Sequence, residues 1–279
     1  MSNEFKSKFE FEPDSEAGPE AESNSDRTKA TKMQSFLSLL QITDSALPIG
    51  SYSHSWGLET FVQSGTIKNS AEAASAISNL LRFTLAPREG AGAALAYRFE
   101  KSPNRVNNRN SLATLNNYLS ASLWVKETHD ASVQMGERLL RLALSLGWCE
   151  PADLNAFHYQ YMNAANTKDG MAKCAGEIKY ACHHCVAVGF LGAKLGIDIH
   201  DLVPAYLFAS TTALVAALVK LVPLGHTDGQ KILSASQALI AELSPSCLTA
   251  TLSDLGGFAP LSEWAAEAHQ SLYSRIFQS

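Results

Sequence analysis

The sequence predicts an all-α protein, with about ten helices in a single globular, bundle-like domain and a disordered N-terminal tail. Apolar residues recur at spacings of three and four along most of the chain, as they do on the buried face of a helix. No stretch sustains the strict apolar–polar alternation of a half-buried strand. A hydrophobic share of 46% with 18% charged residues, over 279 residues, is typical of a soluble globular protein with a substantial core.

The N-terminal segment differs from the rest in composition. Residues 1–32 are rich in Glu, Ser, Asp and Pro and have few clustered apolar groups, so they are expected to be a disordered extension of the domain at 33–279. The first residues show neither the apolar stretch of a secretory signal nor the basic character of a transit peptide, which predicts a cytoplasmic protein. A formal charge of −5 argues against nucleic-acid binding, and five cysteines do not suggest a disulfide framework.

Helices in the first half follow from periodicity and from capping residues. Phe36, Leu37, Leu40 and Ile42 lie near one face of a first helix that should end before Asp44. Further helices are expected at 71–84, 91–99, from 111 onward and through 124–146. The helix at 71–84 should be capped by Ser70, and Pro87 should break the chain after it.

The second half predicts helices at 152–164 and 176–196. In the latter, Gly189, Gly192 and Gly196 lie near one face, which favours close helix packing over a phosphate-binding loop. The most hydrophobic run is 203–219, where Ser210, Thr211, Thr212 and the following Lys220 make a poor membrane span, so a central buried helix is expected.

The C-terminal third is divided by glycine and proline. Thr227 and Gln230 have the spacing of a capping box for a helix that runs to about 243. Ser244-Pro245 should begin a short helix, Gly256-Gly257 should interrupt the chain, and 262–277 should form the last helix.

Residues 44–59 form the most distinctive loop. Pro48 fixes its own φ and Gly50 tolerates a positive φ, so Leu47 to Gly50 should make a tight turn. Ser55 is expected to cap a helix that carries Glu59 in its first turn, where the helix dipole favours a carboxylate. From the residues alone, a plain connector and a functional loop are equally consistent with this pattern.

Cys182-His183-His184-Cys185 has the ligand types of a zinc, nickel or copper site. On a helix only Cys182 and Cys185 share a face, so a closed site would need ligands from elsewhere. Burial in the core is the favoured interpretation. The alternative is a stand-alone helical metal-binding protein that uses Cys182, His183 and Cys185.

Catalysis has little support in the sequence. Ser53, His54 and Asp44 supply the residue types of a nucleophilic triad, but no G-x-S-x-G elbow accompanies them. Three carboxylates of interest are scattered, and nothing in the sequence brings two of them together: Glu59, Glu127 and Glu137. The last residues combine Tyr, Arg and Phe, which are enriched in interfaces, although a docked last helix explains them equally well.

Five motifs, in order, resemble those of the UreF family of urease accessory proteins. The resemblance covers 33–279. The matching segments are LPIGSYSHSWGLE at 47–59, KETH with MGERLLR at 126–141, His183 with Val186 and Gly189, LVPLGHTDGQ at 221–230, and HQSLYSRIFQS at 269–279. The sequence departs from the family pattern at Lys126, His129, Cys185, His226 and Gln270. The family pattern has no cysteine pair at 182 and 185, so this spacing looks incidental.

The resemblance implies a helical scaffold or chaperone that is not an enzyme and binds no cofactor tightly. Members of the family bind UreD (also called UreH) and recruit the GTPase UreG. The assembly then meets apo-urease, and GTP hydrolysis is coupled to the delivery of nickel to its dinuclear site. The resemblance also implies that the protein is a homodimer within that complex. It implies no binding to nucleic acid or to a membrane.

The resemblance also implies roles for particular residues. Partner contacts fall on the C-terminal motif, at His269, Tyr273, Arg275, Phe277 and Ser279. His54 and Glu59 are candidates for a position near the route of nickel. The residues that shape the two loops are Leu47, Pro48, Gly50, Gly57, Pro223, Gly225 and Asp228.

Overall fold

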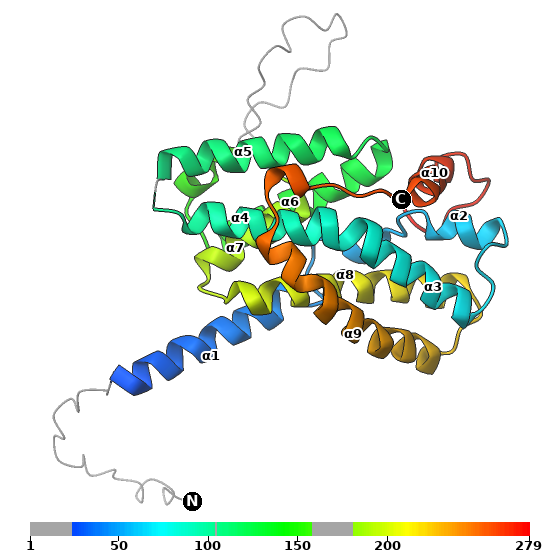
Figure 1. The fold of residues 1–279 in the computed structure, drawn as a ribbon, viewed down its shortest axis with the longest axis horizontal. Coiled ribbons are helices and arrows are strands. Elements are labelled where there is room, and N and C mark those ends of the chain that lie inside the picture. Colours follow the sequence, from blue (N-terminus) through cyan, green and yellow to red (C-terminus); the bar gives the residue numbers. More distant parts are fainter. Residues whose placement is uncertain (1–23, 104, 158–180) are drawn as a thin grey trace, which may run out of the picture. The chain divides into compact units, whose positions relative to one another are not determined.

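The computed structural model describes residues 24–103, 105–157 and 181–279 (Figure 1). The regular structure of these residues is entirely helical and includes ten α-helices, which confirms the predicted all-α class. The chain divides into two compact units, residues 1–34 and 35–279, and the second contains the core. The helix α1 (Asn24–Ile42) begins well before Met33, and residues 1–23 of the predicted tail lie outside the described residues.

The remaining helices follow with short connections. The α-helices are α2 (Leu58–Gln63), α3 (Ser70–Leu80), α4 (Ala91–Lys101), α5 (Arg105–Ser122), α6 (Lys126–Ser145), α7 (His184–Lys194), α8 (Ile199–Leu221), α9 (His226–Thr249) and α10 (Pro260–His269). A π-helix, η2 (Leu81–Gly90), joins α3 to α4. The described residues also include three short 3₁₀ helices, η1 (Ser51–Ser53), η3 (Pro151–Phe157) and η5 (Leu252–Asp254).

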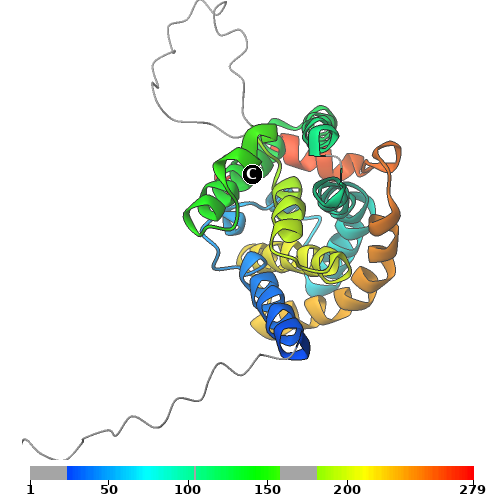
Figure 2. The same ribbon diagram turned by 90° about the vertical axis from the view of Figure 1, so that its left-hand side faces the viewer.

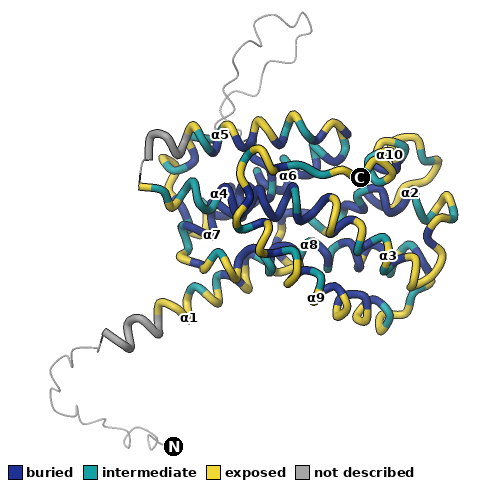
Figure 3. The backbone as a smooth tube through the Cα atoms, in the orientation of Figure 1, coloured by how far each residue is buried: buried dark blue, intermediate teal, exposed yellow. Residues whose placement is uncertain are grey.

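The core surrounds α7, which packs against α4, α6 and α8 (Figure 2). A Cβ at Gly189 would collide with the backbone of Ala93, so the small residue lets α7 approach α4 closely, as predicted. The inner faces of these helices are buried, whereas α5 and α9 alternate between buried and exposed turns (Figure 3). This packing fixes the positions of the helices that carry the sequence motifs.

α8 is the one helix in the described part of the chain that is long and apolar enough to cross a membrane, and 50% of its most apolar stretch is buried inside the protein. Thr211 and Leu214 belong to its buried face, as predicted for a core helix. It begins at Ile199, earlier than expected, because the side chain of Asp198 caps it by accepting the His200 N–H.

Two prolines lie inside helices, although the sequence predicted a break in the helical structure at each of them. The chain stays helical through Pro87, which lies inside the π-helix η2, where the wider turn absorbs the missing N–H of proline. Pro245 lies inside α9 rather than at the start of a separate helix. Both segments are held in tertiary contact, since Leu85 and Cys247 are buried in the same cluster.

Two predicted caps are also wrong. Asn69, not Ser70, caps α3 by accepting the N–H groups of Ala71 and Glu72. The Thr227–Gln230 capping box does not form, because α9 begins at His226 with Gly225 as its N-cap and no side-chain cap.

Other predicted helices have different limits as well. The last helix, expected at 262–277, ends at His269, and residues 270–279 follow an irregular path. The expected helix at 152–164 is the 3₁₀ helix η3 as far as Phe157, and 158–164 lies outside the described residues. The helix expected at 176–196 begins at His184; of the residues before it, 176–180 lie outside the described part.

Candidate functional site

The loop at 44–59 makes the predicted turn. Pro48 and Ile49 form the turn, the Ile49 N–H donates to the Leu47 carbonyl over 2.7 Å, and Gly50 has a φ of +86°. Arg138 of α6 fixes the turn from the other side, because its Nη1 donates to the Ile49 carbonyl over 3.1 Å. The turn is therefore rigid before the chain enters η1.

The loop ends with two successive left-handed residues, Trp56 (φ 53°) and Gly57 (φ 84°). Gly57 is the N-cap of α2, so the prediction that Ser55 caps this helix is wrong. The Ser55 hydroxyl instead donates to the Ser279 carbonyl over 2.8 Å and lies 3.5 Å from the Glu59 N–H. A Cβ on Gly57 would lie 2.8 Å from the Ala266 backbone nitrogen, so this position lets α10 approach the loop.

Glu59, in the first turn of α2 as predicted, holds the C-terminal segment. Its carboxylate is fully buried. Oε1 accepts the Ile276 N–H over 2.8 Å, and Oε2 accepts the Phe277 N–H over 3.0 Å. A single side chain thereby provides the acceptors for two consecutive backbone donors, which explains why this segment needs no helix.

His269, at the end of α10, lies between two carboxylates. Its Nε2 is 3.1 Å from Glu59 Oε2, and its Nδ1 is 2.7 Å from Glu127 Oε2. Each ring nitrogen therefore lies within hydrogen-bond distance of a carboxylate oxygen, so the ring bridges the two acids. Arg275 completes the series by donating from Nη1 to Glu127 Oε1 over 2.9 Å. Two acids, the buried Glu59 and the partly buried Glu127, thus alternate with the basic side chains of His269 and Arg275.

The last residues are fixed by the loop itself. The Gln278 N–H donates to the Ser53 carbonyl over 2.8 Å, and the Ser279 hydroxyl lies 2.8 Å from His54 Nδ1. Burial and the nearby charge of Arg138 lower the pKa of His54 to about 4, so the ring is neutral at pH 7. We call this arrangement the C-terminal clasp: residues 53–59 and Glu127, holding His269 and residues 274–279.

The clasp separates the predicted interface residues into two groups. His269, Phe277 and Ser279 are buried, and Phe277 lies beneath Lys220, whose Nζ is 5.8 Å from the ring centroid. Tyr273 is fully exposed, and Ile276, which was not predicted as a contact, is 70% exposed. The buried group positions the backbone, and the exposed group is available to a partner.

The prediction that nothing brings two of the three carboxylates together is wrong for Glu59 and Glu127. His269 joins them, although they lie on α2 and α6. Glu137, the third, pairs instead with Arg141 on its own helix. The KETH motif could have identified Glu127 as a candidate site residue. A residue within a motif shared with a family is a candidate even when its contact partner is distant in sequence.

The cysteine–histidine cluster serves the core. Cys182 precedes α7 instead of sharing a helical face with Cys185, because the helix begins only at His184. His183 is fully buried between the hydroxyls of Ser120 and Ser132, at 2.9 and 3.1 Å.

Burial also disfavours the charged forms of these histidine and cysteine side chains. Burial lowers the pKa of His183 to about 3 and raises the pKa of both Cys182 and Cys185. No group of three or more His, Cys, Asp or Glu side chains suited to a metal ion occurs among residues 24–103, 105–157 and 181–279.

The residues of the hypothetical nucleophilic triad have other partners. The Ser53 hydroxyl donates to the Gly50 carbonyl, His54 faces Ser279, and Asp44 accepts the Ala46 N–H. None of the three is oriented toward another, so the triad does not form.

The second loop, with Pro223, Gly225 and Asp228, stands at the start of α9. The Asp228 N–H donates to the Gly225 carbonyl over 2.9 Å, and its side chain pairs with Lys231. These contacts shape the entry to α9 and take no part in the clasp.

Comparison with known proteins identifies the family. Residues 67–237, more than half of the chain, match the family model named UreF. The chain belongs to the UreF family.

Three relatives named urease accessory protein UreF support this membership over most of their length. The protein of Bacillus sp. (strain TB-90) is 34% identical over 247 residues, which cover 88% of this chain and 100% of the relative. Those of Lachnoclostridium phytofermentans and Nostoc sp. (strain PCC 7120) are 31% and 30% identical, over 87% and 88% of this chain and 98% and 96% of the relatives. Each of these relatives is named an accessory protein.

Proposed function

We propose that this UreF-family chain is a scaffold that links UreD (UreH) to the GTPase UreG and so assists GTP-dependent insertion of nickel into apo-urease. It acts in the cytoplasm, as a homodimer within that complex, and performs no catalysis itself. Nickel is the cargo of the assembly and not a tightly bound cofactor of this chain. Membership of the UreF family supports a role in urease maturation, and the clasp supports a docking role.

The observation that carries the docking proposal is the contrast within residues 273–277. Backbone donors on Ile276 and Phe277 are bound to the buried Glu59, whereas the side chains of Tyr273 and Ile276 face outward. A partner that binds a segment already held in one conformation loses less entropy in ordering it. Exposed Tyr and Arg side chains on such a segment are the residue types that dominate binding energy at interfaces.

The test is the affinity of the full-length chain for UreD after the substitution Tyr273→Ala. Because this side chain is fully exposed, the substitution should leave stability unchanged and weaken binding roughly 30-fold, the size of a typical hot-spot loss. The measurement is biolayer interferometry against UreD, followed by nickel-dependent urease activation in cells that express UreD, UreG and apo-urease.

Leu146→Ala is the matched control, since this residue is also exposed but lies beyond the opposite end of α6 from Glu127. It should bind UreD as the parent chain does. Unchanged affinity in Tyr273→Ala would contradict docking through this segment. Normal urease activation in cells that lack the chain would contradict the scaffold itself.

A further inference from the structure

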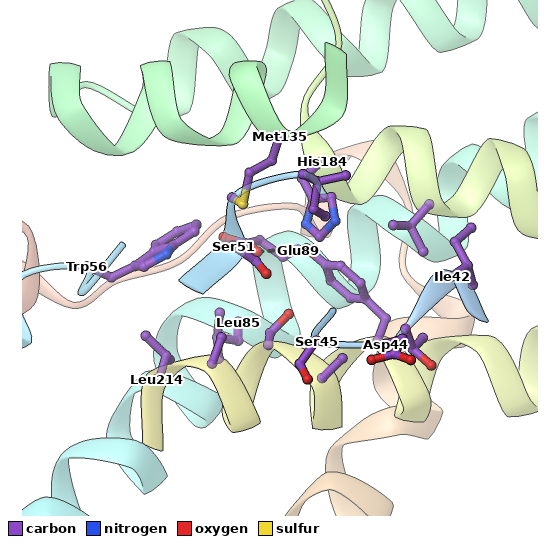
Figure 4. A pocket seen from close by; sticks show the side chains of 17 residues that line it. Ile42, Asp44, Ser45, Ser51, Trp56, Leu85, Glu89, Met135, His184 and Leu214 are labelled. Carbon is purple, nitrogen blue, oxygen red and sulfur yellow. Dashed lines mark hydrogen bonds between the residues drawn. The ribbon is translucent and has the colours of Figure 1, made fainter. Parts of the chain in front are cut away.

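A cavity of about 60 Å³ opens beside the loop at 42–51, between η2, α7 and α8 (Figure 4). It is large enough for more than one water molecule. Apolar side chains form most of its wall, among them Ile49, Leu85 and Leu214. Nothing in the clasp or in the proposed docking segment uses it, apart from Trp56, which lines its edge.

Glu89 is the unexplained group in this cavity. The residue is only 5% exposed, and its Oε2 accepts the Tyr206 hydroxyl over 2.9 Å. Its Oε1 is buried without any hydrogen-bond partner in the described structure. A buried acceptor left unpaired costs free energy, so the site is complete only when something donates to Oε1.

The other polar groups around the cavity are also acceptors or neutral. Asp44, Ser45 and Ser51 lie along the lining, and His184 faces Glu89 across the space (Figure 4). Burial lowers the pKa of His184 to about 4, so the ring carries no charge at pH 7. No lysine or arginine belongs to the described lining residues. The lining therefore carries acidic groups without a lysine or arginine of its own, and the nearest cation that acts on Glu89 is Arg88.

Arg88, the neighbour of Glu89, does not donate the missing hydrogen bond to Glu89 Oε1. Its Nη1 lies 3.7 Å from Glu263 Oε1, and its side chain lines a different cavity, beside Trp124. Consecutive residues of η2 thus direct an acid and a base into separate spaces.

We propose that the Glu89 cavity receives a lysine or arginine side chain of a partner protein. The methylene stem of such a side chain packs against the apolar wall while its charged end donates to Glu89 Oε1, as long basic side chains do at partly apolar sites. The acidic Asp44 favours the approach of a cation. A bare metal ion fits less well, because the described residues offer no set of three His, Cys, Asp or Glu ligands there.

The test uses n-butylammonium as a mimic of the lysine side chain and 1-butanol as its uncharged counterpart. Binding to the full-length chain is followed by NMR through the methyl resonance of Met135, which lines the cavity. Butylammonium should shift this resonance saturably and bind at least tenfold more tightly than 1-butanol. Glu89→Gln should abolish that preference while preserving an acceptor for the Tyr206 hydroxyl.

Two further variants keep the outcome interpretable. Ala213→Leu, at another lining position, should block both probes while leaving Glu89 in place. Glu242→Gln removes an exposed acid paired with Arg82, outside the cavity, and should change nothing. If Glu89→Gln fails to fold, Ala213→Leu still decides whether the probes enter this cavity.

Four results would overturn the proposal. The first two are the absence of a saturable shift and equal affinity for the two probes. The third is an unchanged preference for butylammonium in a folded Glu89→Gln variant. The fourth is displacement of butylammonium by Ni²⁺ that depends on Glu89, which would make this a metal site. The inference goes beyond the proposed scaffold function and does not rest on it, since the probes need neither UreD nor UreG.

Discussion

At the scale of the residue, Glu59 decides the conformation of the C-terminal segment. Its two carboxylate oxygens accept two backbone N–H groups and face the buried His269. A buried carboxylate is tolerated only when such partners compensate for its lost hydration. Replacing this carboxylate would weaken its contact with His269 and the two backbone hydrogen bonds.

We predict that Glu59→Gln lowers the free energy of unfolding by about 3 kcal/mol, the usual cost of removing one partner from a buried ion pair. Urea denaturation of the full-length chain measures it. The variant should also lose affinity for UreD, because Tyr273 is no longer presented on a fixed backbone. Glu242→Gln, at an exposed ion pair with Arg82, is the control and should leave both quantities almost unchanged. A Glu59→Gln variant as stable as the parent would refute the role assigned to the clasp.

At the scale of the element, periodicity predicted most helices because their apolar faces are local patterns. In α3, for example, the buried residues Ala73, Ile77 and Leu80 recur at spacings of four and three, which the sequence displays directly. The end of the last helix could not be predicted in this way, since the acceptors for residues 276–278 come from Glu59 and Ser53. Contacts between residues more than two hundred positions apart are invisible to a local pattern.

The same reason explains the mixed outcome for the candidate site. The motifs predicted that the 47–59 loop and the C-terminal residues matter, but spacing could not reveal that Glu59 and Glu127 share His269. Nor could it separate buried positions, such as Phe277, from exposed ones, such as Tyr273. The irregular tail has no period from which a face can be deduced.

The contact between α2 and α10 gives a prediction at this scale. Gly57→Ala introduces a Cβ at a φ of +84° and only 2.8 Å from the Ala266 nitrogen, so α10 must move. We expect a loss of roughly 3 kcal/mol in unfolding free energy, from left-handed strain plus the backbone collision. Gly147→Ala is the matched control, because its φ is also positive, at +68°, but no atom lies within 4 Å.

Gly147→Ala should therefore cost about 1 kcal/mol, from strain alone. Both losses are read from urea denaturation curves. Equal losses in the two variants would mean that the approach of α10 to the loop contributes nothing.

At the scale of the whole molecule, buried titratable groups link stability to pH. Burial lowers the pKa of His54 and His184 to about 4 and that of His183 to about 3, from an ordinary value of 6.5. Below pH 6.5 the unfolded chain binds protons at these positions and the folded chain does not. Their contribution to stability is present above pH 6.5 and is lost as the pH falls towards 4.

Glu89 acts in the opposite direction, because burial raises its pKa above 4.5 and the folded state then holds a proton that the unfolded state releases. Between pH 4.5 and 6.5 three histidines thus oppose one glutamate. The net effect is that unfolding takes up protons, so the unfolding free energy should rise with pH across this window. Each net proton contributes at most about 1.4 kcal/mol per pH unit.

Urea denaturation at intervals between pH 4.5 and 6.5 measures this slope. His184→Gln removes one of the three histidines and should flatten it by up to one proton, since the neutral side chain no longer distinguishes the two states. His200→Gln, at an exposed position, should leave it unchanged. A stability that is flat across this range in the parent chain would show that the buried histidines are hydrated or paired in solution and are not held neutral by the core.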